Sequence, residues 1–152
     1  LGAGVRVATI DQSELGRHDP IVKLIKLHGA VGTAVNQHHF SPTSKLPHKK
    51  NKFDWTLGPD ATVLREKYDA DYALFIYLRD SYTSTGRAAV ILIGALFGVA
   101  VQGGTQLGYA SLVDVSSGDI VWFNRLFRAS GDMRTPEGAS ETLEVLLKDF
   151  PS

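Results

Sequence analysis

The sequence contains no cysteine among its 152 residues. This absence excludes disulfide scaffolds, zinc sites built on thiolates and catalysis by a thiol nucleophile. A charge excess is also lacking, because 16 Lys and Arg side chains balance 16 Asp and Glu side chains. Proteins that neutralise nucleic-acid phosphates carry a basic excess as a rule, so no nucleic-acid partner is predicted.

A membrane-spanning run is lacking as well. Residues 88–101 hold no charged residue, Asn, Gln or Pro, but a transmembrane helix needs about 20 apolar residues and this run falls short. Two interpretations stay open for it, a buried core element and an exposed surface for self-association or partner contact. The second interpretation predicts interaction residues at Ile91, Leu92, Leu96 and Phe97.

The glycines of the sequence do not complete either of the common nucleotide-binding motifs. Gly103 and Gly104 are followed by Thr105 and Gln106, with no Lys where a phosphate-binding loop places one. The dinucleotide fingerprint is absent because the glycine spacing is wrong. The sequence therefore predicts no nucleotide site and no cofactor.

The histidines favour structural roles over a metal site. Neighbouring side chains diverge, so His38 and His39 rarely serve one metal ion, and no carboxylate follows them before Asp54. With His48 they are interpreted as loop histidines, and no metal is predicted. His28 lies on the apolar face of the first expected helix, where we expect a hydrogen-bonded core histidine.

Polar residues follow the apolar strand that is expected at 70–79. Arg79 and Asp80, with Arg87 beyond them, could bind a small ligand or form a hydrolytic site, because strand ends commonly hold ligands. They could equally form a structural ion pair. No G-x-S-x-G elbow and no distinctive pair of acids accompanies them, so no catalytic residue and no enzyme is predicted.

Alternating and β-branched residues predict strands at 5–10, 70–79, 106–115 and 119–127. The second of these is apolar on both faces, which is typical of a central strand covered on both sides. The last two form a hairpin, in which Gly118 is expected to take the left-handed conformation.

Three starts that contain Pro predict helices. Asp19 and Thr135 precede Pro20 and Pro136 as N-caps, and the third start follows Gly58. The last helix is expected to bury Ala139, Leu143, Leu146, Leu147 and Phe150. Together these elements predict an α+β fold, a mixed β-sheet of about four to five strands flanked by about three helices, in one domain over residues 1–152.

The segments ADYALFIYLRDSY and GYASLVDVSSGDIVWFNRL carry a family resemblance. The chain resembles bacterial envelope lipoproteins of uncharacterised function. It is more distantly similar to the soluble domains of the curli secretion lipoprotein, the TolB amino-terminal domain and lipoprotein activators of penicillin-binding proteins. The matching residues are Ala70, Asp71, Leu112, Val113, Asp114, Ser117, Gly118, Val121 and Trp122.

This resemblance implies a non-enzymatic binding or assembly module that contacts envelope proteins or copies of itself. It also implies export to the periplasm and membrane association through a lipid-modified Cys upstream of Leu1. The start at Leu1, without Met, fits an expectation that a targeting segment precedes this sequence.

Overall fold

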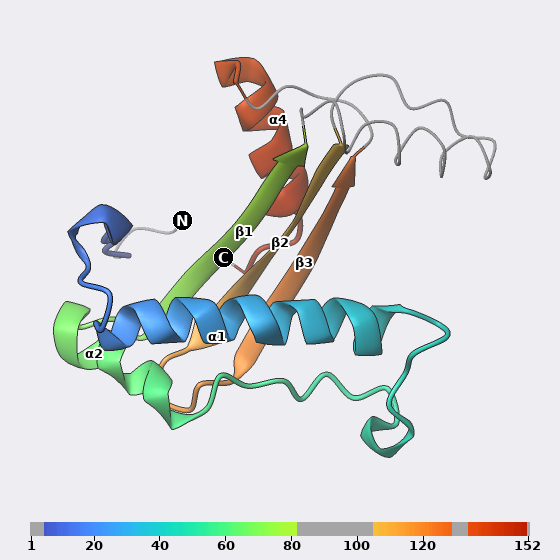
Figure 1. Ribbon diagram of the computed structural model, residues 1–152, viewed down its shortest axis with the longest axis horizontal. Helices are drawn as coiled ribbons and strands as arrows, with labels where there is room; N and C mark the ends of the chain where they lie inside the picture. Colours follow the sequence, from blue (N-terminus) through green and yellow to red (C-terminus); the bar gives the residue numbers. More distant parts are fainter. Residues whose placement is uncertain (1–4, 82–104, 129–133, 152) are drawn as a thin grey trace. The chain divides into compact units, whose positions relative to one another are not determined.

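A computed structural model describes residues 5–81, 105–128 and 134–151 of the chain (Figure 1). Within them three helices accompany an antiparallel sheet whose strands lie in the order β1-β2-β3, which confirms the predicted α+β class. The helices are α1 (Pro20–Val35), α2 (Thr62–Tyr68) and α4 (Pro136–Leu146). The strands are β1 (Tyr72–Ser81), β2 (Thr105–Asp114) and β3 (Ile120–Arg128).

The described residues fall into two compact units, and each unit takes part of every strand. The first unit comprises residues 5–75, 111–123 and 150–151. The second unit comprises residues 76–81, 105–110, 124–128 and 134–149.

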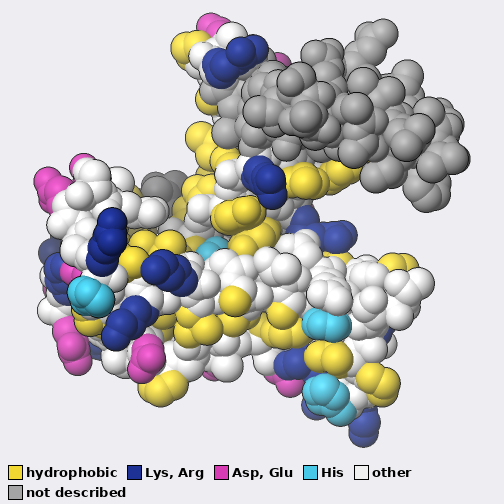
Figure 2. All heavy atoms as spheres, viewed as in Figure 1, with side chains coloured by type: hydrophobic (Ala, Val, Ile, Leu, Met, Phe, Trp, Pro, Cys, Tyr) yellow, Lys and Arg dark blue, Asp and Glu magenta, His cyan; other side chains and the backbone are white. Residues whose placement is uncertain are grey.

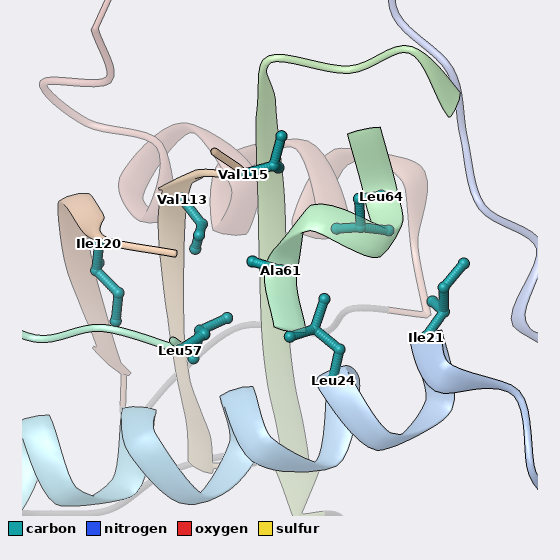
Figure 3. Close-up of a cluster of buried hydrophobic side chains, with 8 residues drawn as sticks. All are labelled: Ile21, Leu24, Leu57, Ala61, Leu64, Val113, Val115 and Ile120. Carbon is teal, nitrogen blue, oxygen red and sulfur yellow. The ribbon is translucent and has the colours of Figure 1, made fainter. Parts of the chain in front are cut away.

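The first unit has an apolar core between its helices and strands. α1 begins where the Asp19 carboxylate accepts a hydrogen bond from the Ile21 N–H at 2.8 Å. From there the helix buries one side at a spacing of three to four residues. Figure 3 shows eight side chains from α1, α2, the strands and their loops that point toward one another: Ile21, Leu24, Leu57, Ala61, Leu64, Val113, Val115 and Ile120.

The hairpin turn between β2 and β3 is held against the loop that precedes α2. Gly118 has a φ of 80°, as predicted, and its N–H donates to the Asp114 carbonyl at 2.8 Å. Its own carbonyl accepts from the Leu57 N–H at 2.8 Å. A side chain at Gly118 would collide with the backbone of Gly58, so the turn requires glycine for both its conformation and this close approach.

The second unit packs α4 on one side of the strands. The Thr142 hydroxyl, on the buried side of α4, donates to the Gln106 Oε1 of β2 at 3.0 Å. The Asn124 side-chain amide of β3 donates to the Leu146 carbonyl at 3.0 Å, near the end of the helix. Within the second unit, residues at even positions of β2 and β3 therefore face α4, and residues at odd positions project from the opposite side.

Three expectations about the elements are wrong. Residues 5–10 form no strand, and Val5 and Val7 leave 58% and 72% of their surface exposed. β1 is an edge of the described sheet and not its centre, with Tyr72 and Leu74 exposed. In α4 the buried stripe is rotated relative to the predicted one, because Leu143, expected to be buried, is 40% exposed.

Candidate functional site

One side of the second unit's strands carries large side chains that no helix of that unit covers among the described residues. On β2 and β3 these are the odd-numbered residues opposite α4. On β1 the same side is identified by Tyr77, whose ring stacks on that of Tyr109 at 5.1 Å between centroids. We name this surface the open face, and its residues are Tyr77, Arg79, Leu107, Tyr109, Arg125 and Phe127.

Three of the four apolar residues of the open face are exposed to solvent, whereas Tyr109 is buried. Tyr77 is 45% exposed, Leu107 43% and Phe127 74%, and each lies on a different strand. Figure 2 shows hydrophobic side chains together with Lys or Arg side chains over these strands, beside atoms that are not described. Single exposed apolar residues are common, but a group that spans three adjacent strands makes this side a candidate interaction surface.

The charge on the open face has one sign. Arg79 and Arg125 are exposed on it, and none of the six residues that define it is acidic. Arginine and aromatic side chains are enriched where proteins bind each other, because guanidinium groups stack on rings and pair with carboxylates. The face is therefore suited to a partner surface that is both apolar and acidic.

The structure brings one of the three predicted ligand-binding residues to this surface. Arg79 projects from the open face near the end of β1. Asp80 follows it within the strand, but its side chain is outside the described part of the structure, and so is the whole of Arg87. The predicted interaction residues Ile91, Leu92, Leu96 and Phe97 also lie outside the described residues.

His28 of α1 is a core residue, as its position on the helix predicts. It is 3% exposed, its Nε2 lies 2.6 Å from the Ser111 Oγ, and its ring stacks on Phe75 at 4.6 Å. Burial lowers the pKa of His28 to about 4, because the core disfavours the charged imidazolium. A Ser–His pair can act as nucleophile and base, but Ser111 is fully buried and presents no hydroxyl to a substrate.

His38 and His39 were expected in a loop, but they lie in a π-helical turn, Asn36–Phe40, that continues from α1, and both have structural contacts. His38 Nδ1 lies 2.8 Å from the Ser44 carbonyl oxygen. The His39 ring meets Phe40 and Phe53 edge-on, with centroids 4.9 Å and 5.1 Å apart. Within the described ranges no group of three His, Cys, Asp or Glu residues could hold a metal ion.

A groove of about 460 Å³ lies in the first unit between α1 and the start of α2. It mixes an apolar floor with charges of both signs, and it is lined by Pro20, Lys23, Leu24, Leu27, Asp60, Thr62, Val63 and Glu66. This mixture of apolar side chains and charges of both signs points to no one class of ligand.

Sequence reasoning missed the open face, although a signal for it was present. Large apolar and arginine residues alternate along two strands, as Tyr77 with Arg79 on β1 and Arg125 with Phe127 on β3. Alternation of this kind places both residue types on one side of a sheet. The signal was hidden because the intervening residues are also apolar.

Neither protein-family models, nor curated proteins, nor solved structures yielded a match to this chain. In addition, none of the helices within the described ranges is long and apolar enough to cross a membrane.

Proposed function

We propose that this protein is a non-enzymatic binding or assembly module that contacts an envelope protein or a second copy of itself through the open face. The observation that carries the proposal is the exposure of Tyr77, Leu107 and Phe127 on three adjacent strands.

Burial of this surface in a complex would be favourable. Full burial of a side chain such as Leu or Phe stabilises a protein or complex by about 1.5–3 kcal/mol relative to exposure. Leu107 and Phe127 offer much of that area to water in the isolated chain. Arg79, beside them, would select an acidic partner and speed the encounter, since charge complementarity acts mainly on specificity and association rate.

The cellular setting of the proposal comes from the sequence resemblance. The protein would be a periplasmic domain of a bacterial cell-envelope lipoprotein, held at the membrane by a lipid anchor upstream of Leu1. Ile91, Leu92, Leu96 and Phe97 would extend the contact surface beyond the open face. We also propose that the complete sheet has four to five strands, as the sequence predicts. The described residues form three of them.

Site-specific photo-crosslinking in cells tests the proposal. A photoreactive residue in place of Leu107 is expected to form a covalent adduct with an envelope protein or with a second copy, identified by mass spectrometry. Leu27 provides a matched control position, because it is also a leucine, is 38% exposed and belongs to α1 in the chain's first unit. Equal adduct formation at the two positions, or none at either, would show that the open face is not a binding surface.

The alternative function, a ligand-binding or hydrolytic site near Arg79, Asp80 and Arg87, stays a prediction. Only Arg79 has a described side chain, and it is exposed on the side of β1 that also carries Tyr77. We therefore give the binding module precedence.

A further inference from the structure

The outer side of α4 carries exposed apolar and acidic residues. Thr142 and Leu146 face the strands, so Glu144, two residues from Thr142 and about 200° around the helix, points away from them. Leu143 and Val145 flank Glu144 and are 40% and 44% exposed. Burial in the core therefore does not explain these two apolar residues.

The charge on this side of α4 is negative. Glu137, Glu141 and Glu144 are exposed, and the helix contains no Lys or Arg. Glu141 is partly neutralised, because its carboxylate accepts from the Arg128 Nη2 at 3.1 Å. Glu137 and Glu144 keep the outer side of α4 acidic as well as apolar.

We propose that the outer side of α4 in one copy of the chain packs on the open face of a second copy. This inference rests on the proposed function and names the partner. The two surfaces are complementary, since Glu144 lies between Leu143 and Val145 on one of them, and arginines lie among aromatic and leucine side chains on the other. A helix would then cover each side of the second unit's strands, a common layered arrangement.

The dimensions of the two surfaces agree. An 11-residue helix is about 16 Å long at a rise of 1.5 Å per residue. Three strands spaced about 4.8 Å apart present a surface roughly 10–15 Å wide. One helix of this length therefore spans all three strands and reaches the exposed residues on each.

The contact joins two different surfaces, so it is directional. Each copy keeps a free open face or a free α4 after the first contact, which allows rings or chains to form. Symmetric pairing of two open faces would instead bring the positive charges of both copies into one interface, and like charges in an interface are unfavourable. An interface made of one short helix lies at the small end of specific interfaces, so we expect weak, salt-sensitive association.

Charge reversal in the 152-residue chain tests the proposal, with sedimentation velocity as the readout over a wide range of protein concentrations. Arg79→Glu and Glu144→Arg are each expected to weaken self-association at least about tenfold. An equimolar mixture of the two variants is expected to associate again, because a wild-type α4 then meets a wild-type open face. Glu14→Arg, at an exposed acid of the first unit, is the matched control and should associate like the wild type.

Three results would overturn the proposal. The first is unchanged association of Glu144→Arg, and the second is a mixture that associates no better than its components. The third is a wild-type chain that stays monomeric at every concentration. If position 107 nevertheless forms adducts with another protein, the proposed function holds and only the second copy is excluded as its partner. Circular dichroism checks that each variant is folded. If a charge reversal unfolds the chain, Arg79→Gln and Glu144→Gln are used instead, and a smaller loss of self-association is expected.

Discussion

Acidification should destabilise the first unit through a single buried side chain, His28. The unfolded chain binds a proton on this imidazole with a pKa near 6.5, whereas burial in the folded chain lowers the pKa to about 4. Between these values the unfolded state holds a proton that the folded state lacks. Stability is therefore fully present above about pH 6.5 and falls as the pH drops toward 4.

The size of the effect follows from the two pKa values. Each unit of pKa difference corresponds to about 1.4 kcal/mol, and integration of the proton-binding difference gives a loss of about 2.5 kcal/mol between pH 7.5 and pH 4.5. Four aspartates with lowered pKa among the described residues contribute only at lower pH, because their stabilisation is lost as the pH falls below 3.8. They are Asp11, Asp19, Asp54 and Asp114.

Urea unfolding followed by tryptophan fluorescence measures this loss. The chain has two tryptophans, Trp55 and Trp122, and both belong to the first unit. His28→Gln, which keeps an amide near Ser111 but does not titrate, is expected to remove most of the pH dependence between 7.5 and 4.5. His48→Gln, in the exposed loop, should keep the wild-type dependence, and equal pH profiles for the wild type and His28→Gln would refute the reasoning.

Three further perturbations have defined outcomes. Gly118→Ala should lower the unfolding free energy by about 2–3 kcal/mol, because it combines a left-handed φ with a backbone collision, and a loss under about 0.5 kcal/mol would contradict the turn geometry. Thr142→Val should cost about 1–3 kcal/mol by removing the donor to Gln106 Oε1, and adding Gln106→Met should recover most of that loss in thermal unfolding. The double variant Leu96→Ser and Phe97→Ser should stay folded and self-associate less, as measured by sedimentation velocity. Unchanged association would exclude that segment from assembly, and gross unfolding would indicate a core role.

Helix starts could be predicted because the signals are local. An Asp or Thr cap followed by Pro defines the first residue of a helix through contacts within a few positions. The structure confirms this for α1 at Asp19 and for α4 at Thr135, where the hydroxyl accepts from the Gly138 N–H at 3.1 Å. The glycine turn of the hairpin was predictable for the same reason.

The place of each strand in the sheet could not be predicted, because it depends on distant partners. Residues 70–79 are apolar on both faces, and that pattern is shared by a central strand and by an edge strand with an open face. Likewise, the strand expected at 5–10 needs an adjacent strand edge, and propensity alone does not supply one. The open face remained hidden because its detection requires knowing which side of the strands α4 covers.

The error in the last helix has the same cause and a functional meaning. Leu143 was assigned to the buried stripe because leucine at helical spacing usually faces a core. The structure buries Thr142 in that place, held by Gln106, and leaves Leu143 exposed beside Glu144. Leu143 and Val145 gain burial only when a second surface covers the outer side of the helix. This reversal of the expected pattern, together with the open face, is the reason for proposing that a second copy covers α4.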